Sequence, residues 1–194
     1  FIYRFDATKG TLTPNEPKSG RVAPGSGPRH LAFHPKGGFA YVCNEMLMTV
    51  SAFTVDTSTG AMKEVQVLPT LPEGASAKGA STAEIFCLPN GKALYVSNRG
   101  HNSLAVYAIA ADGKLSLIQH VLDVPAVPRG FGLSNDGRWL LCAGQKSGTI
   151  NAYRVDPATG KLTSLARVDI GRLGAQTIEP LWPLYVELIE PVDP

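Results

Sequence analysis

Short apolar runs alternate with turn residues along the chain, and residues 27–45 show the pattern most clearly. Apolar residues at 31–33 and 39–42 flank the sequence Pro-Lys-Gly-Gly, whose residue types suit a tight reversal of the chain. This pattern predicts an antiparallel hairpin. Because its two strands run in opposite directions, the beginning of the first and the end of the second must lie at the same end, away from the turn.

Three motifs recur in step along the chain, which indicates an internal repeat. A turn that ends in glycine recurs at Gly10, Gly60, Gly113 and Gly160, with spacings of 50, 53 and 47 residues. A second turn recurs at 34–37, 88–91 and 134–137, and a segment with the alternation of a half-buried strand recurs at 49–53, 103–107 and 149–153. Four short strands in each repeat of this length are typical of the blades of a β-propeller.

We therefore expect an all-β fold, a β-propeller with three complete four-stranded blades. The predicted blades are residues 25–74, 75–125 and 126–170, with a partial blade at 1–24 and a divergent tail at 171–194 that is a candidate for one edge strand. Propeller rings have about four to eight blades. The open edges of so few blades should be covered, either by missing blades or by a second copy of the chain.

The charge and the length of the apolar runs exclude two classes of partner. The chain has 18 Lys and Arg against 16 Asp and Glu, a net charge of +2, and 44% of its residues are hydrophobic. This small charge, without basic residues interleaved with aromatic ones, argues against nucleic acid. No apolar run approaches the roughly 18 to 20 residues of a membrane span. We therefore expect no membrane partner and a cytoplasmic location.

The sequence also lacks the usual signatures of metal and cofactor sites. The three cysteines, Cys43, Cys87 and Cys142, are far apart and do not have metal-ligand spacing. We interpret them as buried free thiols, which favour a reducing compartment. A phosphate-binding Gly-x-x-x-x-Gly-Lys loop, a dinucleotide fingerprint and a Gly-x-Ser-x-Gly nucleophile motif are all missing. We therefore expect neither a metal nor a cofactor.

Polar residues recur in register where the predicted inner hairpins begin and end. By the hairpin geometry described above, these residues should all face one mouth of the central channel. The candidate site residues are Arg29, His30, Glu45, Glu84, Arg99, Arg129 and Gln145.

Such a mouth has the chemistry of an esterase that acts on an anionic substrate. Three arginines in one cluster suit the capture of a carboxylate or phosphate and the stabilisation of an oxyanion. Histidine is the side chain most often used as a general base at neutral pH, so His30 is a candidate general base for water, with Glu45 or Glu84 orienting it or serving as the acid. The structural alternative is that Arg99 simply pairs with Glu45 or Glu84 in a ring of ion pairs.

Six ordered motifs resemble the seven-bladed β-propeller lactonase family, which contains propeller-type 6-phosphogluconolactonases and carboxymuconate cyclases. They are Gly-Pro-Arg-His-Leu-Ala-Phe-His-Pro (27–35), Tyr-Val-Cys-Asn-Glu (41–45), Ser-Thr-Ala-Glu-Ile (81–85), Tyr-Val-Ser-Asn-Arg-Gly-His-Asn-Ser (95–103), Pro-Arg-Gly-Phe (128–131) and Ala-Gly-Gln-Lys-Ser (143–147). The resemblance covers roughly residues 1–170 and implies that the chain is a C-terminal portion of such a protein.

The resemblance further implies metal-free hydrolysis of a small anionic sugar lactone, with 6-phosphogluconolactone favoured. Matched motif by motif, it implies catalytic roles for His30, Glu45, Glu84 and Arg129 and substrate-binding roles for Arg29, Arg99 and Gln145. One departure is Phe86, which follows Ile85 where family members often have histidine. The alternatives are a lactone-forming cycloisomerase of the carboxymuconate type and a non-catalytic propeller fragment that serves as a binding or self-assembly scaffold.

Overall fold

The structure, a computed structural model, describes residues 1–170, and these residues form fourteen β-strands. A two-stranded hairpin consists of β1 (Tyr3–Asp6) and β2 (Thr11–Pro14). The first four-stranded sheet consists of β3 (Pro28–Phe33), β4 (Phe39–Asn44), β5 (Thr49–Val55) and β6 (Met62–Pro69). The second consists of β7 (Ser81–Cys87), β8 (Ala93–Arg99), β9 (Ser103–Ile109) and β10 (Leu115–Val121). The third consists of β11 (Pro128–Leu133), β12 (Trp139–Gly144), β13 (Thr149–Val155) and β14 (Leu162–Asp169).

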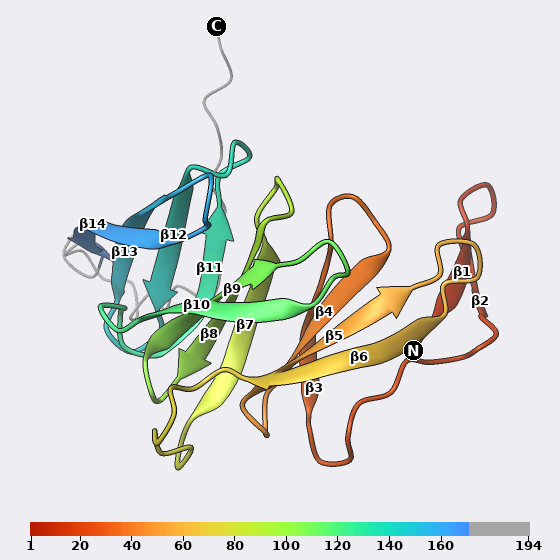
Figure 1. Cartoon of the computed structure of the whole chain (residues 1–194), viewed down its shortest axis with the longest axis horizontal. Coiled ribbons are helices and arrows are strands. Elements are labelled where there is room, and N and C mark those ends of the chain that lie inside the picture. Colours follow the sequence, from red (N-terminus) through yellow and green to blue (C-terminus); the bar gives the residue numbers. More distant parts are fainter. Residues whose placement is uncertain (171–194) are drawn as a thin grey trace, which may run out of the picture.

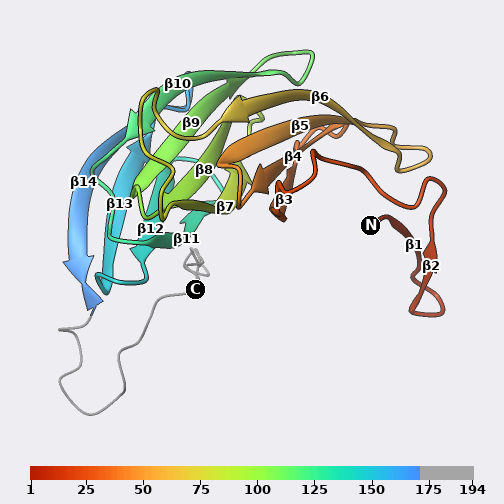
Figure 2. The same ribbon diagram turned by 90° about the horizontal axis from the view of Figure 1, so that it is seen from below.

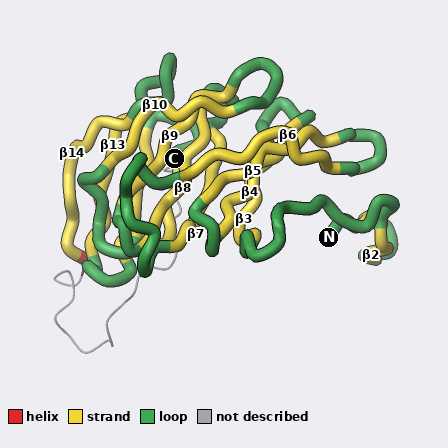
Figure 3. Tube along the Cα trace, turned by 60° about the horizontal axis from the view of Figure 1, so that its bottom comes forward, coloured by secondary structure: helices red, strands yellow, loops and turns green. Residues whose placement is uncertain are grey.

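The sheets stand side by side as blades around a common centre (Figure 1). Every sheet is a simple antiparallel meander, and β7 contacts both β3 and β11, so the first strands of the three blades adjoin each other. Figure 2 shows the blades as an arch, with the β1–β2 hairpin at one end and β14 at the other. Strands and loops make up almost the whole described chain (Figure 3).

The predicted all-β propeller is therefore confirmed. The predicted edge strand at 171–194 lies outside the described residues, and the residue limits of each blade stay a prediction.

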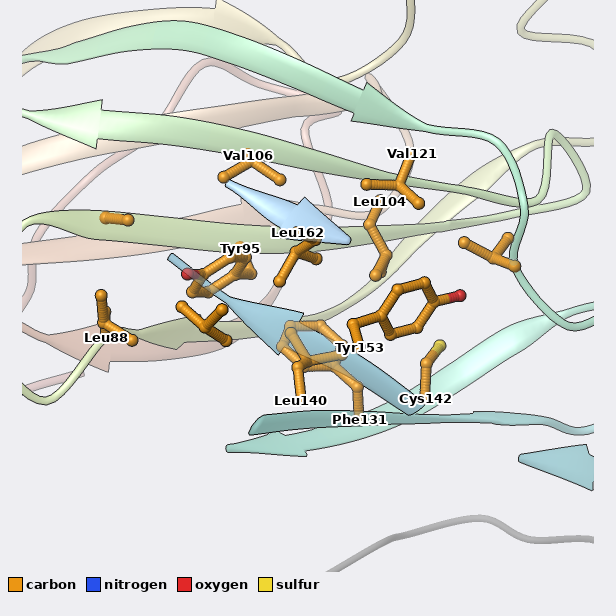
Figure 4. Close-up of a cluster of buried hydrophobic side chains, with 13 residues drawn as sticks. Leu88, Tyr95, Leu104, Val106, Val121, Phe131, Leu140, Cys142, Tyr153 and Leu162 are labelled. Carbon is orange, nitrogen blue, oxygen red and sulfur yellow. The ribbon is translucent and has the colours of Figure 1, made fainter. Parts of the chain in front are cut away.

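The hydrophobic core lies between the blades, and the second sheet buries both of its faces, one against the first blade and the other against the third. Alternate residues of β8 point in opposite directions: Val96 packs against the first blade and Tyr95 against the third. Figure 4 shows the cluster between the second and third blades, where Tyr95 and Leu104 face Phe131 and Tyr153. This double burial explains why the central strands have long apolar runs rather than a polar face.

Two buried tyrosines connect the first blade to a turn of the second and the second blade to a turn of the third. The Tyr41 hydroxyl donates to the Gly113 carbonyl at 3.1 Å, and the Tyr95 hydroxyl donates to the Gly160 carbonyl at 2.8 Å. Gly160 has φ +78°, and a Cβ there would lie 2.3 Å from the Ala93 Cβ. Glycine is therefore needed at position 160 both for the left-handed turn and for the close approach of the neighbouring blade.

We expect the variant Tyr95→Phe to lower the free energy of unfolding by about 1–3 kcal/mol, because the buried Gly160 carbonyl would lose its hydrogen-bond donor. Urea denaturation followed by circular dichroism measures this change. Tyr3→Phe is the matched control, since the Tyr3 side chain is exposed. Equal stability of Tyr95→Phe and the parent chain would show that the inter-blade hydrogen bond contributes nothing.

Local hydrogen bonds hold the turns at the outer ends of the blades. The Asp56 carboxylate accepts hydrogen bonds from the Ser58 hydroxyl and from the backbone N–H groups of Ser58 and Thr59, and these bonds lower the pKa of Asp56 to about 2. The recurring aspartate in the sequence is therefore a turn residue rather than a ligand.

The cysteines are free thiols, as predicted. Cys43 and Cys142 are buried and Cys87 is half-buried, and burial raises the pKa of Cys87 to about 12. Burial therefore keeps this thiol protonated and unreactive. No helix in residues 1–170 has the length and apolar character needed to cross a membrane.

Candidate functional site

The site begins at an irregularity shared by the inner strands of all three blades. The strand pairing shifts between residues 28 and 31 in β3, between 82 and 85 in β7 and between 128 and 130 in β11. Such a bulge bends the strand and re-aims the side chains within it. The bulged residues are Arg29 and His30, Ala83 and Glu84, and Arg129. Four of these five bulged residues, all except Ala83, were predicted from the sequence as site residues.

His30 and Glu84 form a close pair across the first and second blades. His30 Nδ1 lies 2.6 Å from Glu84 Oε1, and the side chains are 42% and 9% exposed, respectively. The same carboxylate oxygen accepts the Ile85 backbone N–H at 3.0 Å, while the Glu84 N–H donates to Ser97 Oγ at 3.0 Å. Glu45 and Glu84 were alternatives from the sequence alone. In the structure Glu84 is the carboxylate that contacts and orients His30.

Glu45 instead lies between two arginines. One carboxylate oxygen forms an ion pair with Arg99 Nη2, and the other lies 3.8 Å from Arg29 Nε. Arg99 Nη2 also donates to the Thr82 carbonyl at 3.3 Å. The structural alternative raised from the sequence, an ion pair between Arg99 and Glu45, is thus present and joins the first blade to the second.

Arg29 closes the cluster by contacting both His30 and the second blade. Its Nη1 donates to the Ala83 carbonyl at 2.5 Å and lies 3.0 Å from His30 Nε2. A guanidinium only donates hydrogen bonds and a carboxylate only accepts them. These two partners therefore assign the imidazole tautomer: Nδ1 carries the proton toward Glu84, and Nε2 presents its lone pair toward Arg29.

Arg129 and Gln145 lie outside this network of contacts. The pairing of Pro128 with Gly144 puts them at the same end of the third blade. Both are half-buried, and neither side chain forms a hydrogen bond or ion pair with any residue in 1–170. The Gln145 backbone N–H donates to the Val127 carbonyl at 2.9 Å. Five of the seven predicted residues are therefore in one connected cluster, and for these two the shared mouth stays a prediction.

A cavity of about 550 Å³ adjoins the cluster and runs along β3 and β7. Arg29, His30 and Glu84 line it together with apolar residues of the two strands, among them Phe33 and Phe86. The Phe86 ring meets the Phe131 ring edge-on, with centroids 5.5 Å apart. The cavity therefore combines a base, a carboxylate and a cation with an apolar wall, which is suited to a small anionic ring compound.

Sequence reasoning missed two groups that shape the site, the Ala83 carbonyl and the Ser97 hydroxyl. A backbone carbonyl has no sequence signature, because every residue carries one. Ser97 lies in the middle of β8, where its alternation with Val96 and Asn98 suggested only a strand. Its contact with the Glu84 N–H exists because the bulge in β7 removes that N–H from the regular ladder.

The chain is similar in sequence to known lactonases. A family model described as "Lactonase, 7-bladed beta-propeller" matches residues 1–174. The chain is 37% identical over 175 residues to a 6-phosphogluconolactonase of Serratia proteamaculans, which covers 90% of this chain and 50% of that protein. It is 38% identical over 181 residues to a 6-phosphogluconolactonase of Yersinia pestis, which covers 92% of this chain and 52% of that protein. The chain thus spans about half the length of these curated relatives.

Solved structures give the same result. A protein from Lactobacillus plantarum has a TM-score of 0.80 at 34% identity, covering 87% of this chain and 48% of that one. A periplasmic gluconolactonase from Pseudomonas aeruginosa has a TM-score of 0.80 at 31% identity, covering 88% of this chain and 48% of that one. The match of the family model to residues 1–174 and the radial four-stranded blades agree: the chain belongs to the seven-bladed β-propeller lactonase family.

Proposed function

We propose that the chain contributes to the hydrolysis of a small anionic sugar lactone, with 6-phosphogluconolactone as the substrate. The relatives at 37% and 38% identity are named 6-phosphogluconolactonases, and the chain corresponds to about half of each. The observation that carries the proposal is the orientation of His30 at the mouth of the cavity, with its Nδ1 2.6 Å from Glu84 Oε1.

In the proposed reaction, His30 activates water as a general base. Its Nε2 takes a proton while the water oxygen bonds to the lactone carbonyl carbon, which gives a tetrahedral oxyanion. Collapse of this intermediate breaks the bond from the carbonyl carbon to the ring oxygen, and the imidazolium returns its proton to that oxygen. Glu84 accepts the Nδ1–H throughout and stabilises the transient positive charge on the ring.

The arginines divide into paired and unpaired groups, and this supports different roles. Arg129 is half-buried without a hydrogen-bond or ion-pair partner in residues 1–170, so we assign it to the anionic group or the oxyanion of the substrate. Gln145, at the same end of the third blade, is assigned to a substrate hydroxyl. Glu45 and Arg99 pair with each other, and we assign them to positioning Arg29 rather than to contact with the reacting atoms.

The proposed reaction requires neither a metal nor a cofactor, and their absence stays a prediction from the sequence. A cytoplasmic location and the absence of nucleic-acid and membrane partners also stay predictions.

Two apolar side chains of the inner strand of the first blade, Leu31 and Phe33, are 43% and 62% exposed. We propose that further blades or a second copy cover such surfaces, because large exposed apolar patches usually mark an interface.

An assay of three substrates tests the proposed function. We expect the purified chain to release acid from 6-phosphogluconolactone faster than buffer alone and faster than from the neutral glucono-δ-lactone. Titration of the released acid at constant pH measures both rates. Cyclisation of carboxymuconate without lactone hydrolysis would instead favour the cycloisomerase. A folded chain that accelerates none of the three reactions would contradict the proposal and favour a non-catalytic scaffold.

A further inference from the structure

The lone pair that the proposed reaction needs is already occupied. His30 Nε2 must present its lone pair because Arg29 Nη1, at 3.0 Å, only donates hydrogen bonds. Water therefore has no free acceptor on His30 until the guanidinium moves. The other ring nitrogen offers no alternative, because its proton is held by Glu84 at 2.6 Å. Arg29 is thus a cap on the base.

The contacts of the Arg29 guanidinium allow it to move away from His30. The strongest ion pair of Glu45 is with Arg99, and the second carboxylate oxygen lies 3.8 Å from Arg29 Nε, at the outer limit of an ion pair. Arg29 Nη1 divides its donors between the Ala83 carbonyl and His30. Neither of these neutral acceptors competes well with a doubly charged phosphate, which binds arginine through two parallel charge-assisted hydrogen bonds.

The cap also lies where an anionic substrate enters. Arg29, His30 and Glu84 line the same cavity of about 550 Å³, so a ligand in it reaches the guanidinium and the imidazole together. The side chain of Arg29 is 18% exposed and is part of the cavity lining. An oxyanion that binds Arg29 from this side pulls it away from Nε2 and vacates the position that water must take.

We propose that Arg29 couples recognition of the anionic group of the substrate to activation of His30. This inference rests on the proposed function and deepens it, since it makes the phosphate of the substrate an activator of the catalytic base and not only a binding handle. A lactone with the same ring but without an anionic group leaves the cap in place. The anionic group therefore increases the rate of the chemical step as well as the affinity.

The test separates the ring from the anion. Glucono-δ-lactone is assayed with and without inorganic phosphate, after subtraction of hydrolysis in the same buffer without protein. We expect phosphate to raise the turnover of this neutral lactone by about tenfold, within the usual range of coupling between two ligands. In Arg29→Met, which keeps an unbranched side chain and removes the hydrogen-bond donors, phosphate should have no effect. Arg138→Met is the matched control, because Arg138 pairs with Asp136 at a turn of the third blade.

Two outcomes would overturn the proposed role of Arg29. Phosphate could accelerate lactone hydrolysis by Arg29→Met as much as by the parent chain, or it could accelerate hydrolysis by neither. A second measurement does not depend on turnover. The ¹⁵N resonance of His30 Nε2 should shift when phosphate is titrated into the parent chain and into Arg138→Met, but not into Arg29→Met. If phosphate shifts the ¹⁵N resonance of His30 Nε2 in a chain that hydrolyses no lactone, the proposed function is refuted but the role of Arg29 is retained. If the chain hydrolyses lactone and phosphate causes no shift, only the role of Arg29 is refuted.

Discussion

Replacing His30 with glutamine is expected to lower kcat for lactone hydrolysis by about 100- to 10,000-fold, the usual contribution of a general acid–base group. Glutamine keeps a polar side chain of similar size, but it cannot take a proton from water or return one to the ring oxygen. KM should change much less than kcat, because the arginines that hold the anion are unchanged. Initial rates of acid release over a range of 6-phosphogluconolactone concentrations separate the two parameters.

The matched control for this variant is His34→Gln. His34 lies at the turn between β3 and β4, at the opposite end of the hairpin from His30, and its Nε2 contacts the Gly91 carbonyl at 3.1 Å. We expect its kcat to stay within about twofold of the parent value, since a polar side chain away from the reacting atoms seldom affects the chemical step. A folded His30→Gln chain that keeps more than a tenth of the parent kcat would exclude His30 as the base.

Replacing Phe131 with alanine is expected to lower the free energy of unfolding by about 3–5 kcal/mol. Phe131 is completely buried on β11, in the cluster between the second and third blades (Figure 4). Its ring also packs edge-on against Phe86. Alanine would remove this contact and leave a cavity that rigid strands fill only partly. Because the free energy of unfolding of a whole domain is only about 5–15 kcal/mol, this loss would remove a large part of the chain's stability. Urea denaturation measures the loss.

Phe5→Ala provides the matched control for Phe131→Ala. Phe5 lies on β1, and its side chain is 65% exposed, so the same chemical change removes few packing contacts. Its effect should stay within about 0.5 kcal/mol. Similar losses for Phe5→Ala and Phe131→Ala would mean that the packing between the second and third blades does not stabilise the chain.

The fold was predictable because its signals are local and repeated. Turn residues such as Asp56 and Gly60 bond or bend their own neighbours, so their roles are visible in a few consecutive residues. The recurring alternation of the strands identified four strands in each repeat. Repetition then raised these short signals above chance, since one such hairpin would have indicated little on its own.

The contacts of the site were predictable only in part, because all of them cross between blades. His30 contacts Glu84, Arg29 contacts the Ala83 carbonyl, and Glu45 contacts Arg99, each pair separated by 54 residues. Each contact therefore joins a residue to its equivalent in the next repeat. The repeat brought these residues to the same rim, but Glu45 and Glu84 were equally close to His30 by that criterion. The bulges in β3 and β7 made the difference.

The third blade illustrates the same limit. The pairing of Pro128 with Gly144 corresponds to that of Pro28 with Asn44 and of Thr82 with Asn98, so Arg129 takes the position of Arg29 and of Ala83 in its own blade. In the same register Gly130 takes the position of Glu84 and cannot extend the chain of ion pairs. Arg29 donates to the Ala83 carbonyl of the next blade, but no blade follows the third within residues 1–170. Arg129 therefore has no equivalent partner there, although its sequence motif resembles that of Arg29.

The amino-acid sequence by itself determined the strands, the turns, the propeller class and the rim on which polar residues gather, because periodicity and turn chemistry act over a few residues and are repeated in every blade. The tertiary structure alone decided that His30 pairs with Glu84, that Glu45 binds Arg99, and that Arg29 covers the lone pair of His30. The physical reason is that hydrogen bonds depend on shifts of a few tenths of an ångström to a few ångströms, and those shifts arise where one blade packs on another.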